Sequence, residues 1–172
     1  MSESIFKNPA IIGYLVKKLH EAYPDKQIGK TLVQKMIYFL TRERIVNFNY
    51  SMYHYGPYSA DVTSELNFAE NSGLIDIKWV DGAGYFAEAT PGLKKLEGLI
   101  QDSEKSAIDK LIGRFGSFST VDLSLLATAY FMKDNFGTPN EKLADVIHNL
   151  KPRYSTSYIR GVLEKGGITS RR

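Results

Sequence analysis

Cysteine is absent from this sequence, which excludes disulfide bonds and zinc sites built from thiolates. No apolar run approaches the ~18 residues that a membrane-spanning helix needs. The first ten residues, MSESIFKNPA, also lack the apolar core of a secretory signal peptide. These absences predict a cytoplasmic protein that does not enter a membrane.

An excess of one charge is lacking as well, because 22 basic and 19 acidic residues leave a net charge of +3. That balance alone indicates no nucleic acid, membrane or acidic partner. Catalytic sequence motifs such as paired carboxylates, a nucleophile elbow or a glycine-rich phosphate loop do not occur. Gly29-Lys30-Thr31 resembles the end of a phosphate loop, but Pro24 stands where its first glycine is required. The three histidines have no metal-ligand partner at helical spacing. We therefore expect no catalytic residue, no cofactor and no metal.

Apolar residues recur at helical spacing through most of the chain, which predicts a mainly α-helical fold. Asn8 is expected to cap the first helix, with Pro9 at its first position, and Thr138 to Glu141 to form a capping box. Ser59 is expected to cap the third helix. The predicted helices span residues 9–22, 30–44, 59–72, 91–101, 104–114, 120–133, 139–150 and 155–165.

A small β-hairpin is predicted near residues 75–89, where Asp81-Gly82-Ala83-Gly84 supplies the turn. The order of helix, helix, helix, hairpin and helix over residues 9–101 is that of a winged helix-turn-helix. We therefore predict a winged-helix-like domain at 1–101 with a helical C-terminal extension packed on it at 102–172, or a single domain that contains both.

The charge of the predicted recognition helix argues against DNA reading by that helix. Cationic side chains supply most of the non-specific affinity for DNA phosphates. Residues 46–90 nevertheless contain one basic residue, Lys78, and six acidic ones, whereas the rest of the chain is basic on both sides. Nucleic acid is therefore a candidate partner through the basic ends, but not through the 59–72 helix. The acidic residues are Asp61, Glu65, Glu70, Asp76, Asp81 and Glu88.

The most unusual stretch is FNYSMYHYGPY at residues 48–58. In its first half, aromatic and apolar residues alternate with polar ones. This alternation predicts a short extended segment with Phe48 and Tyr50 packed between the second and third helices. Tyr55-Gly56-Pro57-Tyr58 is expected to be a rigid turn, since glycine relieves backbone sterics and proline fixes φ.

The remaining tyrosines of this stretch cannot all share its buried side. Exposed tyrosines offer a large contact area at little entropic cost, which suits a protein interface. Acidic side chains on the helix that follows could receive Arg or Lys from a partner. The predicted partner-binding residues are Tyr53, Tyr55, Gly56, Pro57, Tyr58, Asp61 and Glu65.

Two stretches resemble the Panacea-domain family, which includes SocA-like antitoxins and phage-associated proteins. They are KTLVQKMIY at 30–38 and YGPYS at 55–59. The family pattern has leucine, glutamine and lysine in succession, whereas Val33 here separates the leucine from the other two. Residues 125–129 and 150–154 are similar to the YwgA-like branch. The resemblance implies a helical, winged-helix-like protein that neutralises a toxin by direct binding and has no catalytic residues.

Three functions follow as hypotheses. The first is a non-enzymatic protein-binding module, for which a toxin is one candidate partner. The second is a DNA-binding winged-helix transcriptional regulator. The third is an enzyme or nucleotide-binding protein whose site only the fold assembles.

Overall fold

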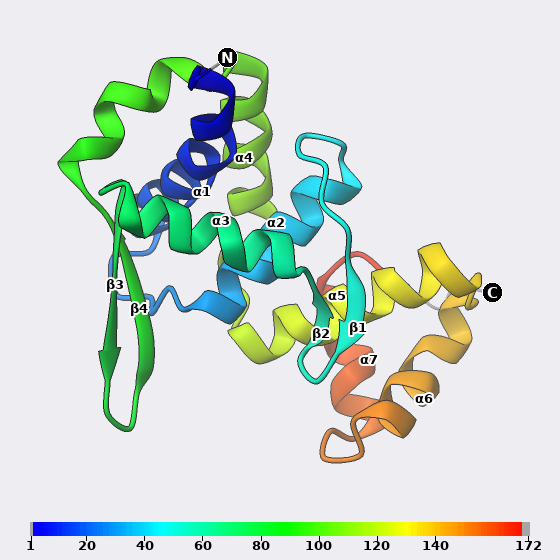
Figure 1. Ribbon diagram of the computed structural model, residues 1–172. Helices are drawn as coiled ribbons and strands as arrows, with labels where there is room; N and C mark the ends of the chain where they lie inside the picture. The colour runs from blue at the N-terminus through cyan, green and yellow to red at the C-terminus, as the bar shows by residue number, and fades with distance from the viewer. Residues whose placement is uncertain (1, 170–172) are drawn as a thin grey trace.

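The computed structural model describes residues 2–169, and side chains from residue 5 onward. Within that range the fold is mainly α-helical with a small β-hairpin at 75–89, as predicted, and it contains a second antiparallel sheet of two strands that was not predicted (Figure 1). No helix in this range combines the length and the apolar character that a bilayer crossing requires. The elements are α1 (Ser2–Ala22), α2 (Lys30–Arg42), β1 (Ser51–Tyr53), β2 (Gly56–Tyr58), α3 (Ala60–Asn71), β3 (Ile75–Val80), β4 (Gly84–Ala89), the 3-10 helix η1 (Pro91–Leu99), α4 (Asp102–Phe115), α5 (Thr120–Phe136), α6 (Asn140–Leu150) and α7 (Thr156–Lys165).

The first part of the chain has the predicted order of three helices followed by the β3–β4 hairpin. Ser59 caps α3, because its side chain accepts a hydrogen bond from the amide of Val62. The hairpin is bonded to the connection between α1 and α2, where the amide of Ala87 donates to the carbonyl of Ile28 at 2.8 Å. Its tip projects away from the helices (Figure 1).

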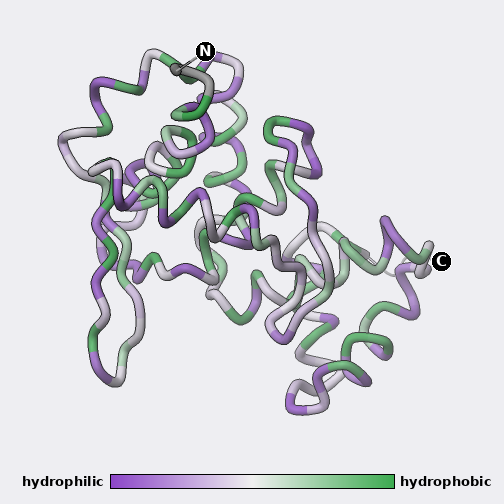
Figure 2. Tube along the Cα trace, viewed as in Figure 1, coloured by the Kyte–Doolittle hydropathy of each residue, from purple (hydrophilic) through white to green (hydrophobic). Residues whose placement is uncertain are grey.

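One hydrophobic core holds the helices together, and it contains residues from both 1–101 and 102–172. Phe39 of α2 stacks on Phe115 of α4, with ring centroids 4.4 Å apart, and meets the edge of Tyr130 of α5 at 5.7 Å. Eight consecutive residues of α5, Leu123 to Tyr130, are buried, so this helix is enclosed on all sides. Hydrophilic stretches lie at outer turns, such as the one between α6 and α7 (Figure 2).

Two local predictions are wrong. Helix α1 begins at Ser2, and Pro9 lies inside it, so Asn8 does not cap the helix. The N-cap of α6 is Pro139 and makes no side-chain cap bond, so the capping box at Thr138 does not form. The helix predicted at 91–101 forms over residues 91–99 as a 3-10 helix, in agreement with the two glycines that weaken α-helix formation there.

The first two turns of α1 depend on an aromatic contact. Pro9 has no amide hydrogen, so it cannot donate to the preceding turn of the helix. Phe6 compensates by stacking on Phe68 of α3, with centroids 5.4 Å apart and 25° between the ring planes. The α1 segment before Pro9 is therefore held to α3 by packing.

We predict that Phe6→Ala frays this segment and lowers the free energy of unfolding by about 1 kcal/mol, the usual worth of an aromatic pair. Hydrogen exchange should show faster exchange at the amides of Lys7 and Asn8. The control is Ile5→Ala, because the Ile5 side chain is 57% exposed and its loss should leave exchange unchanged. Equal protection in both variants would show that the stack does not hold the helix start.

Candidate functional site

The aromatic stretch forms a β-hairpin of its own, made of β1, the turn His54-Tyr55 and β2. Tyr53 pairs with Gly56 across the turn, and Ser51 pairs with Tyr58 at the open end. The predicted turn at 55–58 is therefore wrong: only Tyr55 lies in the turn, and Gly56, Pro57 and Tyr58 are strand. Gly56 has φ +98°, the left-handed region that a glycine supplies when it follows a two-residue turn. We call residues 53–58 the tyrosine hairpin.

Two neighbouring side chains of α2 hold the second strand of this hairpin. Gln34 donates from Nε2 to the carbonyl of Ser59 at 2.8 Å and accepts from the Ser59 amide at Oε1, at 3.1 Å. Lys35 donates from Nζ to the carbonyl of Pro57 at 2.7 Å. The strand is therefore bonded to α2 through side chains, although none of the strands within residues 2–169 pairs with its outer edge.

The turn of the hairpin is bonded to the C-terminal helices. Lys151, directly after α6, donates from Nζ to the carbonyl of His54 at 2.8 Å. Burial, and then the nearby charge of Arg153, lower the pKa of Lys151. Helices from both ends of the chain thus fix the hairpin backbone.

The three tyrosines predicted to bind a partner differ in their exposure to solvent. Tyr53 and Tyr55 are 58% and 64% exposed, as an interface requires. Tyr58 is half-buried, and its hydroxyl shares a hydrogen bond with Thr63 Oγ1 at 2.8 Å. Gly56 and Pro57 are buried and act as scaffold for the exposed rings.

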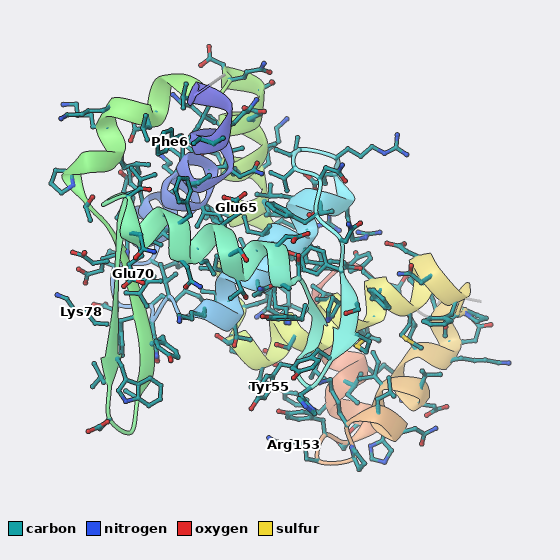
Figure 3. The ribbon with its side chains drawn as sticks, viewed as in Figure 1. Phe6, Tyr55, Glu65, Glu70, Lys78 and Arg153 are labelled. Atoms are coloured by element: carbon teal, nitrogen blue, oxygen red, sulfur yellow. The ribbon has the colours of Figure 1, made fainter. Side chains whose placement is uncertain are left out.

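Of the two predicted acidic residues on α3, the structure leaves Asp61 exposed and turns Glu65 toward α1. Burial is the main cause that raises the pKa of Glu65, and a hydrogen bond from Asn8 of α1 opposes it. Figure 3 shows Glu65 beside the α1 helix and Tyr55 at the far end of the hairpin. The structure therefore does not bring Glu65 together with the exposed tyrosines.

A groove runs beside the tyrosine hairpin and was not predicted. It consists of three adjoining hollows of about 280, 280 and 200 Å³. Thr31 lines all three, and each of four further residues lines two of them: Lys30, Tyr55, Tyr85 and Thr120. The start of α2, the β4 strand, the start of α5 and the α6–α7 connection all contribute to it. In Figure 3, Tyr55 and Arg153 mark the end of the groove that lies between the hairpin and that connection.

The described residues show no metal centre, since no three His, Asp or Glu side chains between 5 and 169 gather closely enough to hold an ion. Of the histidines, His54 packs against the ring of Tyr53 at 4.6 Å, and His148 is bonded through Nδ1 to the carbonyl of Tyr154 at 2.6 Å. Both have structural contacts that account for their positions.

We predict that Gly56→Ala destabilises the protein more than Gly73→Ala. Both glycines have positive φ, +98° and +73°, so each alanine costs about 1–2 kcal/mol of backbone strain. A Cβ at position 56 would also lie 2.7 Å from Thr128 Oγ1 and 3.1 Å from the Ser124 carbonyl, whereas at position 73 it meets nothing. Urea unfolding should show ~1–3 kcal/mol more loss for Gly56→Ala. Equal losses would mean that the hairpin does not pack tightly on α5.

Lys35 generates a pH prediction. The residue is 2% exposed, and burial together with the charge of Lys151 lowers its pKa from 10.5 to about 8. Above pH 8 the folded protein releases the Lys35 proton while the unfolded chain keeps it up to pH 10.5, so stability increases with pH in this window. Relative to Lys35→Met, the wild type should gain up to about 2 kcal/mol between about pH 8 and 9.5.

Urea unfolding of both proteins across a pH series measures this difference. The comparison cancels groups common to both proteins, among them Tyr38 and Tyr50, whose pKa values burial raises. Stability curves that run parallel above pH 8 would show that Lys35 keeps an ordinary pKa.

Comparison with models of known protein families and with curated protein sequences finds no match for this chain.

Proposed function

We propose that the protein is a non-enzymatic binding module that contacts another protein through the tyrosine hairpin. One observation carries the proposal: Tyr53 and Tyr55 are the exposed rings of a hairpin whose backbone is fixed from α2 and from the residue after α6. A preformed contact surface loses little conformational entropy when it binds. Exposed tyrosines on such a surface are typical of interface hot spots.

The partner class comes from the resemblance to Panacea-domain antitoxins, which suggests a toxin neutralised by direct binding. The residues of that resemblance, Gln34 and Lys35 with the Tyr-Gly-Pro-Tyr-Ser stretch, include the groups that position the exposed tyrosines. Support for the antitoxin role rests on this resemblance.

DNA reading by α3 finds no support in its charges. Asp61 is exposed in the first turn of α3, and Glu70 is half-exposed in its last turn. The single basic residue of the segment 46–90, Lys78, lies on β3 and not on α3. Phosphates would be repelled along this helix. We therefore place the interface on the hairpin and not on α3.

The direct experiment is site-specific photo-crosslinking in cells that express the protein at its natural level. A benzophenone amino acid at position 53 or 55 should give one adduct of constant mass, identifiable by mass spectrometry. The same residue at Phe136, which is exposed on the last turn of α5, is the control and should not give that adduct. Absence of an adduct at both hairpin positions, or the same adduct at 136, contradicts the proposal.

Alanine variants then separate binding from folding. Tyr53→Ala and Tyr55→Ala should change the free energy of unfolding by less than ~1 kcal/mol, because both rings are exposed. They should weaken binding of the crosslinked partner by ~1–2 kcal/mol or more, as at a hot spot. Phe136→Ala should affect neither. Variants that unfold early, or that bind normally, would show that the tyrosines serve the fold alone or do not contact the partner.

A further inference from the structure

The groove beside the tyrosine hairpin contains charge of one sign only. Four cationic side chains line its three hollows, and neither Asp nor Glu is among the lining residues. Five tyrosines and four hydroxyl residues make up much of the remaining wall. The cationic residues are Lys30, Lys35, Lys151 and Arg153, and the tyrosines are Tyr53, Tyr55, Tyr58, Tyr85 and Tyr154.

The four cations divide into two pairs. Lys35 and Lys151 donate to carbonyls of the hairpin, so they hold the fold while adding positive charge to the wall. Lys30 lies over the ring of Tyr85, at 4.1 Å from the centroid, and Arg153 lies over that of Tyr154 at 5.6 Å. Within residues 5–169 none of the four makes an ion pair with a carboxylate, whereas Lys7, Lys17, Lys18 and Arg42 do.

The charge changes sign at the borders of the groove. Asp61 lies next to the hairpin at the start of α3. Asp81, in the turn between β3 and β4, accepts a hydrogen bond from the indole of Trp79, whose ring packs against the lining residue Tyr85 with centroids 4.8 Å apart. The positive surface is therefore short. A long polyanion that followed it would run into carboxylates at these borders.

We infer that the groove binds a short acidic segment of the protein partner, in which Asp or Glu side chains alternate with apolar or aromatic ones. The carboxylates meet Lys30 and Arg153, and the apolar side chains pack on the tyrosine rings. This inference rests on the proposed function and names the partner's chemistry at the same site. The acidic borders favour a protein segment over a nucleic acid strand, whose charge repeats at every nucleotide.

Selection from a random peptide library displayed on phage tests the inference with the intact protein as bait. The peptides enriched on the wild type should be acidic, with apolar or aromatic neighbours. Lys30→Gln and Arg153→Gln should each weaken the best peptide about tenfold, the scale of one charge-assisted contact. The control is Lys95→Gln, which removes an exposed lysine of η1 outside the groove and should leave affinity unchanged. Lys35 and Lys151 stay intact because they hold the hairpin.

A charge exchange provides the second measurement. Lys30→Glu should bind the selected peptide poorly, and a peptide with one Glu changed to Lys should restore part of that loss, although each change alone is unfavourable. Fluorescence anisotropy at two salt concentrations measures these affinities, and binding of the wild type should weaken as salt rises. Unfolding curves of the variants show that the fold is intact.

The outcomes separate the inference from the proposed function. If the selected peptides are neutral or basic and their binding depends on Tyr53 and Tyr55, the inference of an acidic segment is overturned, but the proposal of a protein-binding hairpin is supported. Oligothymidylate that binds more tightly than the acidic peptide, and depends on Lys30 and Arg153, would overturn it in favour of a nucleic acid. No enrichment of any peptide, combined with no photo-adduct at the hairpin, would overturn both.

Discussion

The hydrogen bonds between α2 and the backbone at residues 57–59 are the interaction on which the candidate site depends. Gln34 satisfies both the amide and the carbonyl of Ser59, and Lys35 satisfies the carbonyl of Pro57. Ser59 is also the N-cap of α3, which begins at the next residue, Ala60. One short contact therefore sets the path of the hairpin and the start of the following helix. Since buried backbone groups without partners are costly, neither side chain is freely replaceable.

The two stretches that resemble the Panacea family are direct partners in space. One supplies Gln34 and Lys35, and the other supplies the carbonyls and the amide that these side chains bond. A Lys that is 2% exposed and faces a carbonyl instead of a carboxylate is costly to bury, since desolvation disfavours its charged form. The cost is tolerated in a position that fixes the backbone of a hairpin with two exposed tyrosines.

Sequence reasoning recovered the elements whose signals are local. Apolar spacing located the helices, and Ser59 and the glycines of the β3–β4 turn marked boundaries that the structure confirms. The prediction was wrong at Pro9: α1 continues through the proline, and its segment before Pro9 packs on α3 through the half-buried stack of Phe6 on Phe68. The turn predicted at Gly56 and Pro57 was also wrong, because both residues lie in a strand. Proline is compatible with this strand edge, since the group of Pro57 that bonds to Lys35 is its carbonyl and the missing amide is not needed.

The groove could not be predicted, because its charged residues are distant in the sequence. The sequence has an acidic middle segment, residues 46–90, between two basic segments, and it predicted a partner-binding surface in which Asp61 and Glu65 accompany the tyrosines. The fold instead brings Lys30 and Lys35 from the N-terminal basic segment to the groove beside the hairpin. It brings Lys151 and Arg153 there from the C-terminal basic segment. Local charge at a binding surface follows from which blocks the topology brings together. The hairpin therefore faces cations, although all but one of the charged residues in 46–90 are acidic.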